Sequence, residues 1–380
     1  MENRTELFAF FGFTLLLFIA SLGFYFTKTV EPLSLSSTNL EECNTLISNE
    51  EGVINTVFFS TKEQAEEYSN YLLNSLPFTD YKKAFNFYYI TPEQYSPECE
   101  IYKGIAALCY NSELIKKSAS CPNDFIVVID KQSINIRSSA YLNVMSLNSK
   151  HSLNVYLHEF GHSFANLAEE YVPARIPRGS ENCQRSCEDF DGEINGCYQE
   201  CSNSDYYRTI ESGVMRTLFS SEFGVFNSRN IIEIIESKYS ESSITGAAIS
   251  EEIECSQQKY FLIEVQNING EIQILDKSIQ IGCSPSSSGF NSDFTYKIFT
   301  EEKRLILEDS RNLNIFTDIQ FENNEEISGE TFNAIEEGEV FFIISPYIEQ
   351  ASRLEIINEN SGESTELSLR DLGGEVACKL

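Results

Sequence analysis

The chain has 380 residues, and its 58 Asp and Glu against 27 Lys and Arg give a formal net charge of −31 at pH 7. This acidity excludes nucleic acid as a partner, because the chain would repel a phosphate backbone instead of neutralising it. The length exceeds what one ordinary hydrophobic core holds, so we expect two folded units and a membrane anchor.

The first feature in chain order is an uncharged, mostly apolar segment from Leu7 to Phe26. A helix of this length rises about 30 Å, which is the thickness of a bilayer core. A cleaved signal peptide has a shorter apolar run before the cut, and a cut after Gly23 is the alternative here. We predict a cytoplasmic stub and single transmembrane helix over residues 1–29, followed by a stem over 30–51.

All eleven cysteines follow this apolar segment. Such a density is typical of an oxidising compartment, where disulfides persist. We therefore expect the protein to be attached to the cell membrane with its folded part outside the cytoplasm, or to be secreted if the segment is cleaved. Because eleven is odd, at least one thiol is unpaired or bridges to another chain, and Cys378 is the easiest to leave over.

Strands and helices alternate after the stem. The segment that follows Thr61 has an N-cap residue and one apolar face, which predicts a helix. Short β-branched and aromatic runs predict strands at 53–59, 84–90, 124–130 and 140–147. A second helix follows the last of these strands directly. This order predicts an α/β domain over residues 52–250, built on one mixed sheet.

The sequence pattern changes at about Cys255, where helical periodicity ends. The dipeptide Asn269-Gly270 lies between two alternating runs, which is the strongest short-range signal for a β-hairpin. Further runs of strand length lie at 294–299, 303–307, 339–344, 353–357 and 366–370. We predict an all-β sandwich domain over residues 253–380.

The stretch LHEFGHSFANLAEEY holds two of the three histidines in the chain. Residues four apart on a helix lie on one side, about 6 Å apart along the axis, so His158 and His162 can bind one Zn²⁺. Glu159 is then placed to act as the general base toward a zinc-activated water. The alternative is an amphipathic core helix with two buried histidines. Gly161 weighs against it, because glycine within a helix costs about 1 kcal/mol relative to alanine.

A catalytic zinc site uses three protein ligands and keeps one position open, so the two histidines need a third partner. The remaining histidine, His151, would lie about 10 Å from His158 along a helix, which is too far. The carboxylates of Glu169 and Glu170 come next, but on a straight helix they too lie about 10 Å beyond the second histidine. We therefore expect the helix to end near residues 165–167 and the chain to turn back.

The spacing leaves the choice between these two carboxylates open. Thermolysin-like sites take their third ligand from a later helix, and the segment NSRNIIEIIESK offers Glu233 or Glu236 for that role. The downstream stretch SGVMR favours the first arrangement instead.

The histidine motif resembles that of the IgA-cleaving zinc endopeptidase family, a metzincin-clan group whose helix reads H-E-F-G-H-S-F-x-x-L-A-D-E-Y. The segment LPFTDYKKAFNFYYI is similar to a P-F-x-x-Y-x-x-x-F-N-V-Y segment ahead of that helix. AYLNVMS resembles the edge strand along which substrate would lie, and SGVMRTLFSSEFGVFNSRNI resembles the downstream segment. The resemblance covers about Val53 to Tyr239.

The resemblance implies a metzincin-like mixed sheet with an active-site helix and a zinc peptidase activity. It implies that Glu169, which stands where the family has Asp, is the third ligand rather than Glu170. It also implies that Met215 forms a hydrophobic floor under the metal. Tyr206 or Tyr207, shortly before this methionine, is a candidate for stabilising the developing oxyanion with its phenol.

A cysteine-rich hairpin over residues 180–204 departs from the family pattern. Two C-x3-C pairs lie there, formed by Cys183, Cys187, Cys197 and Cys201. On helices each pair would share a face, so we expect two short antiparallel helices joined by Cys183–Cys201 and Cys187–Cys197 disulfides. A structural four-cysteine zinc site is the alternative.

Together these features predict a membrane-anchored zinc metalloendopeptidase that faces away from the cytoplasm and hydrolyses a protein or peptide substrate. Its metal ligands would be His158, His162 and Glu169, with Glu159 as the general base. The alternative is a peptidase-like cell-surface binding or adhesion protein that no longer cuts, because a fold alone does not establish activity. A purely structural ectodomain is the third possibility.

Overall fold

The computed structural model describes residues 40–244, 254–268, 271–286, 293–317, 320–322, 325–327, 330–333 and 338–372. These residues fall within one compact unit. The predicted anchor from Leu7 to Phe26, the turn at Asn269-Gly270 and Cys378 lie outside the described residues. Within the described ranges, no helix combines the length and the apolar character that a membrane span requires.

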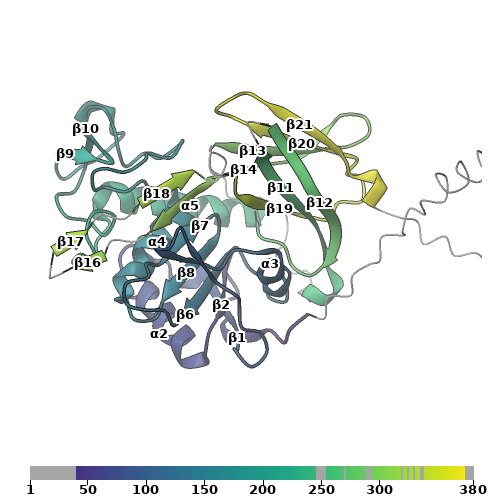
Figure 1. Cartoon of the computed structure of the whole chain (residues 1–380), viewed down its shortest axis with the longest axis horizontal. Coiled ribbons are helices and arrows are strands. Elements are labelled where there is room, and N and C mark those ends of the chain that lie inside the picture. Colours follow the sequence, from purple (N-terminus) through teal and green to yellow (C-terminus); the bar gives the residue numbers. More distant parts are fainter. Residues whose placement is uncertain are drawn as a thin grey trace, which may run out of the picture. The chain divides into compact units, whose positions relative to one another are not determined.

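The fold is mixed α/β and contains an eight-stranded sheet of order β1-β3-β2-β6-β8-β7-β15-β18 (Figure 1). Its centre is parallel: β2 pairs with β3 and β6, and β6 pairs with β8. The bounds of these strands are Ile54–Phe59 for β2, Phe85–Ile90 for β3, Phe125–Asp130 for β6 and Val144–Asn148 for β8. Both faces of a parallel sheet are covered, which explains their nearly continuous apolar sequences.

Helices cover the two faces of this sheet. One face packs on α2 (Lys62–Leu73) and α4 (Leu153–Ala165), which share a hydrophobic core with alternate strand residues. The other face packs on α3 (Ser112–Ser118). The expected cap of α2 is confirmed. The Thr61 hydroxyl accepts from the backbone N–H of Gln64, and the side-chain carbonyl of Gln64 accepts from the backbone N–H of Thr61. The fourth helix, α5, spans Gly224–Ile244.

Two antiparallel sheets form most of the C-terminal region and share one hydrophobic cluster. The first has the order β12-β11-β19, with bounds Glu271–Ile281, Lys259–Ile268 and Val340–Pro346. The second has the order β14-β13-β20-β21, with bounds Leu305–Arg311, Phe294–Phe299, Arg353–Asn358 and Ser364–Ser368. All five runs predicted as strands after the hairpin therefore contain strands.

Some elements cross the predicted domain boundaries. β15 (Asn314–Thr317) and β18 (Glu330–Asn333) come from the C-terminal region but extend the first sheet beyond β7. At the other edge, β1 (Asn44–Ile47) comes from the predicted stem and pairs antiparallel with β3. Two short two-stranded pairs lie outside these sheets: β4 (Glu100–Tyr102) with β5 (Ala106–Leu108), and β16 (Gln320–Glu322) with β17 (Glu325–Ile327).

The single strand predicted over residues 140–147 is wrong. The segment forms two antiparallel strands, β7 (Ser139–Tyr141) and β8, joined by a tight turn. Leu142 in this turn has a φ of 55°, and the Asn143 side chain donates to the backbone carbonyl of Asp124. The turn is held by this long-range hydrogen bond and lacks the glycine or proline that marks most turns in a sequence.

Within the described ranges five disulfides join ten cysteines, which agrees with the expected oxidising environment. The predicted pairs Cys183–Cys201 and Cys187–Cys197 are both present, so these sulfurs do not form a four-cysteine zinc site. The two predicted helices are wrong. The segment instead contains the antiparallel strands β9 (Tyr198–Cys201) and β10 (Asn203–Arg208). Residues four apart share a face in a strand as they do in a helix, so the spacing did not distinguish them.

Candidate metal centre

Helix α4 ends three residues after the second histidine, within the range predicted for the turn. It stops at Ala165, and Asn166 adopts a left-handed conformation with φ of 50°. The N–H of Asn166 donates to the carbonyl of His162 at 3.1 Å, and the N–H of Leu167 donates to that of Gly161 at 3.3 Å. This cap reverses the chain direction, as predicted for residues 165–167.

The reversed chain returns Glu169 to the two imidazoles. Glu169 Oε1 lies 3.1 Å from His162 Nε2, and Glu169 Oε2 lies 3.2 Å from His158 Nε2. The two Nε2 atoms are 3.2 Å apart. These three side chains are buried and form a group that could hold a metal ion. The structure therefore brings together the three residues that we expected as ligands.

Backbone carbonyls orient both imidazole rings. His158 Nδ1 lies 2.9 Å from the carbonyl oxygen of Val214, and His162 Nδ1 lies 2.7 Å from that of Leu167. A carbonyl only accepts hydrogen bonds, so each Nδ1 carries the proton and donates it. Each Nε2 is then directed at the carboxylate, which is the orientation that a metal-binding imidazole needs.

The separations of the donor atoms fit a small divalent ion. With metal–ligand distances of about 2.0–2.2 Å, tetrahedral ligand atoms lie about 3.3–3.6 Å from one another. The two imidazole nitrogens, 3.2 Å apart, are close to this range, and one ligand atom from each of the three residues lies within 4.8 Å of the others. Two imidazole nitrogens and one carboxylate oxygen are also a donor set that zinc accepts.

Charge is concentrated in this buried group. Burial by itself lowers the pKa of His158, but the Glu169 carboxylate outweighs burial and raises that pKa to about 10. Burial raises the pKa of Glu169, but the two imidazoles outweigh it and lower that pKa to about 2. Burial keeps the pKa of His162 below its ordinary value. Without a metal, the group therefore contains one imidazolium and one carboxylate at neutral pH.

Metal binding is expected to release the His158 proton. The raised pKa means that this imidazole is protonated below about pH 10 in the metal-free protein, whereas a ligand must be neutral. Affinity for Zn²⁺ should thus increase by about tenfold for each pH unit between pH 6 and 8. Titration calorimetry in buffers of different ionisation enthalpy would count the proton released, and a pH-independent affinity would contradict the prediction.

Glu159 and Tyr171 complete the immediate surroundings. Glu159 is fully buried next to the ligands, and its charge contributes to the raised pKa of His158. Burial and the charges of Glu169 and Glu159 raise the pKa of the Tyr171 phenol well above its ordinary value, so it stays protonated. Tyr171 was not among the predicted site residues, although it is the last residue of the quoted motif.

Met215 packs directly against α4. It is fully buried, and a Cβ atom placed on Gly161 would lie 2.7 Å from its sulfur and 3.0 Å from the ring of Phe223. The adjacent Val214 carbonyl holds His158, as described above. Close approach of this methionine explains why glycine occupies a helix position that normally disfavours it.

Replacement of Gly161 by Ala is expected to destabilise the fold by about 1–3 kcal/mol, because overpacking outweighs the better helix propensity of alanine. The measurement is the urea midpoint of the variant against the parent. In a Met215→Ala background the same change should cost less, since the nearest contact has been removed. An equal cost in both backgrounds would contradict this explanation.

The other candidate residues lie elsewhere. Glu170 is buried, but its Oε1 accepts from the side-chain amides of Asn182 at 3.2 Å and Asn227 at 2.9 Å. Burial raises its pKa to about 7. Its backbone N–H donates to the carbonyl of Met215 at 2.8 Å. Glu170 thus joins the cysteine-rich segment, α5 and the Met215 turn, and is directed away from the imidazoles.

The thermolysin-like alternative is not formed in the described part of the chain. Glu233 lies 3.6 Å from Arg229, and Glu236 accepts from the Tyr81 hydroxyl at 3.0 Å. The metal-binding group contains neither residue.

The remaining candidates also have other partners. The Tyr206 hydroxyl accepts from Arg185 Nε at 3.0 Å, and the backbone of Tyr207 pairs with that of Gln184. Both tyrosines lie on β10, just beyond the cysteine-rich hairpin. His151 contacts the Ile134 carbonyl and does not belong to the metal-binding group, as expected.

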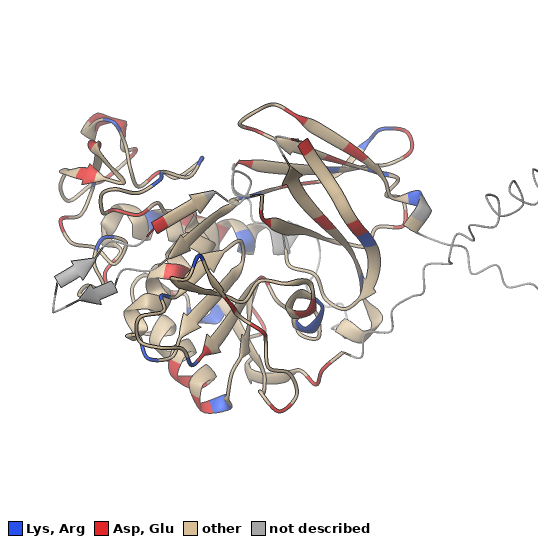
Figure 2. Ribbon diagram, in the orientation of Figure 1, with Lys and Arg blue, Asp and Glu red and all other residues tan. Residues whose placement is uncertain are grey.

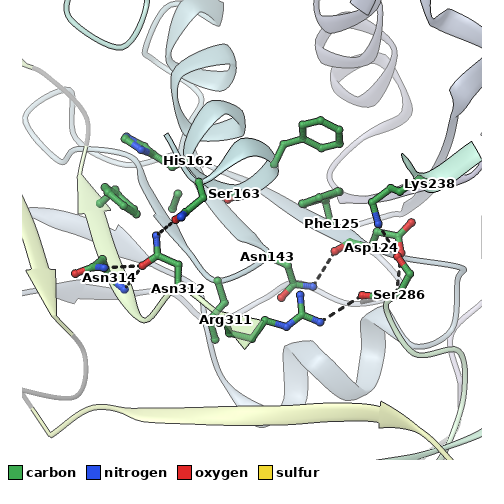
Figure 3. A pocket seen from close by; sticks show the side chains of 15 residues that line it. Asp124, Phe125, Asn143, His162, Ser163, Lys238, Ser286, Arg311, Asn312 and Asn314 are labelled. Atoms are coloured by element: carbon green, nitrogen blue, oxygen red, sulfur yellow. Dashed lines mark hydrogen bonds between the residues drawn. The ribbon is translucent and has the colours of Figure 1, made fainter. Parts of the chain in front are cut away.

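A pocket lined by both polar and apolar side chains lies beside His162 (Figure 3). On one side are His162 and Ser163 of α4, and across from them are Asn312 and Asn314. The Asn312 amide donates to the side chain of Asn166 at 2.7 Å, just after α4 ends. The C-terminal region therefore reaches the metal-binding group.

No known protein-family model matches the chain, and no curated protein matches it significantly.

Proposed function

We propose that the protein is a zinc metalloendopeptidase of the metzincin type, similar to the IgA-cleaving family, that acts on a protein or peptide substrate outside the cytoplasm. The observation that carries the proposal is the convergence of His158, His162 and Glu169, each pair of which makes a contact of 3.1–3.2 Å, with Glu159 buried beside them. The order of β2, β6, β8 and β7 beside α4 is consistent with the metzincin-like sheet that the motif implies.

The remaining parts of the proposal rest on the sequence and on the disulfides. The five disulfides support an oxidising location. Acidic residues are spread over the described elements, and Lys and Arg occur mostly singly among them (Figure 2). With a net charge of −31, a polypeptide remains the preferred substrate class over nucleic acid. The anchor over residues 1–29 stays a prediction.

The chain supplies defined groups for hydrolysis of a peptide bond. A zinc ion held by the three ligands would act as a Lewis acid and lower the pKa of a water molecule to about 7. Glu159 would accept the proton of that water at its carboxylate and deliver it to the leaving amine. The carbonyls of Val214 and Leu167 would keep both imidazoles in the tautomer that binds metal.

A peptidase-like binding protein that does not cut is the second candidate, and one observation favours it. His158, Glu159 and Glu169 are fully buried, and of the three ligands only His162, 3% exposed, reaches the neighbouring pocket. This conformation offers a substrate little access to the ligands, so a working peptidase of this structure would have to open.

The test is to purify the full-length chain in detergent, quantify its metal and map cleavage in a peptide library. We expect about one zinc per chain, by the three-ligand stoichiometry of catalytic sites, and cleavage that a chelator abolishes. A folded, zinc-supplemented protein without stoichiometric metal would overturn the proposal. Stoichiometric metal without cleavage in the parent and in opened variants would favour the binding protein.

A further inference from the structure

The outer edge of β7, the strand next to the metal-binding group, is already paired with another strand. β15 pairs antiparallel with β7, so that Ile315 faces Tyr141, Phe316 faces Ala140 and Thr317 faces Ser139. β18 pairs with the far side of β15. β7 belongs to the segment that resembles the substrate-binding edge strand, and an added peptide strand would form the same kind of ladder there.

Phe316 covers one of the metal-binding imidazoles. Its ring stacks on that of His162, with centroids 3.9 Å apart and an interplanar angle of 8°. Side chains alternate along a strand, and the neighbouring Ile315 packs on the opposite side in the C-terminal core. One face of β15 thus directs Phe316 at the site, and Ile315 on the opposite face packs against the C-terminal sheets.

A second contact joins β18 to the residue range just before β7. The Arg137 side chain is 9% exposed, and its Nη1 lies 3.7 Å from Glu330 Oε1 of β18. Among the described residues, this Nη1 has no partner within hydrogen-bond distance. A buried Nη1 group that faces one distant and half-exposed carboxylate is under-satisfied. A carboxylate that approached more closely would replace Glu330 favourably.

We propose that β15 and β18 occupy the peptide-binding edge of the sheet, and that this chain is therefore held closed by its own C-terminal region until the two strands are displaced. The inference rests on the proposed peptidase function, because it identifies the occupied edge with the substrate site. The displacing substrate would be an extended peptide with an aromatic or apolar side chain over His162 and an acidic group that reaches Arg137.

The ladder that would have to open is short. Three residue pairs join β15 to β7, whereas six pairs join β2 to β3 in the centre of the sheet. Strand addition at an edge gains main-chain hydrogen bonds equal to those lost, so substrate exchanges for β15 without leaving the β7 backbone unpaired. The cost of opening lies chiefly in moving Phe316 and Ile315 out of their buried positions.

The first test replaces Phe316 by Ala in the full-length chain loaded with Zn²⁺. We expect a chelating dye to remove the metal about tenfold faster, because the open state is more populated. Peptide hydrolysis should rise by a similar factor. The matched control is Phe59→Ala, which removes an equally buried ring from the other face of the sheet. Unchanged or slower metal removal in Phe316→Ala would overturn the inference.

The second test locks β15 in place with a Ser139→Cys, Thr317→Cys double variant. Directly opposed residues of antiparallel strands have Cβ atoms about 4.5–5.5 Å apart, and a small shift allows a disulfide. The cross-linked protein should retain zinc against the dye and lose hydrolysis, and mild reduction should restore both metal removal by the dye and hydrolysis. The parent treated with the same reductant controls for the native disulfides.

The outcomes separate the two proposals. If the cross-linked form hydrolyses peptides as fast as the reduced form, β15 is a fixed wall of the site and the inference is wrong, while the peptidase function stands. If metal access responds to both variants but no form cuts any peptide, the strands do cover the metal and the peptidase function is wrong.

Discussion

Replacement of Glu159 by Gln is expected to lower kcat/KM for peptide hydrolysis by about 10²–10⁴-fold, the range that general-base catalysis contributes. Gln has nearly the same shape, so it should fill the same fully buried position. Its amide does not accept a proton at neutral pH. The charge that Glu159 contributes to the raised pKa of His158 also disappears, so a proton will compete less strongly with the metal.

Metal content therefore distinguishes a catalytic role for Glu159 from a structural one. We expect the Glu159→Gln variant to bind zinc at the parent stoichiometry, measured by atomic emission on the same samples used for kinetics. Glu170→Gln is the matched control, since it changes a second buried glutamate of the same segment. Activity within about tenfold of the parent would exclude Glu159 as the general base, given the size of that contribution.

Replacement of Glu169 by Gln is expected to weaken zinc binding by more than about 100-fold, since loss of an outer partner alone costs about 10–100-fold. The carboxylate contacts both imidazoles at 3.1–3.2 Å and is the only anionic oxygen in the ligand group. Without it, the pKa of His158 falls, because Glu169 is the main cause that raises it. In the metal-free variant both imidazoles should therefore be neutral, and the protein should remain folded.

The Glu170→Gln variant should retain the metal. Comparing its zinc affinity with that of Glu169→Gln shows which of the two adjacent carboxylates is the ligand. A Gln carbonyl at this position still accepts from Asn182 and Asn227, so the local hydrogen bonds persist. The measurement is competition for zinc against a chelator of known affinity, with circular dichroism to show that both variants fold. Equal zinc affinity in the parent and Glu169→Gln would show that Glu169 is not a ligand.

Local sequence patterns predicted much of the fold, because the corresponding elements are governed by local physics. β2, β3 and β6 are buried on both faces, and burial on both faces produces continuous apolar runs. Thr61 and Gln64 satisfy each other's backbone groups within one turn of α2. Predictions from ambiguous local signals were wrong: the turn at Leu142 lacks a glycine or proline, and the C-x3-C spacing suits strands as well as helices.

For the candidate site, the sequence by itself determined the paired imidazoles and the neighbouring carboxylate, because three positions on one helix have a geometry set by the helix alone. Only the tertiary structure decided which glutamate faces them, since that depends on the left-handed Asn166 and on the contacts that turn Glu170 away. Only the tertiary structure, too, placed Phe316 on His162. Pairing between β15 and β7 depends on the packing of the whole C-terminal region, and no short stretch of either strand encodes its partner.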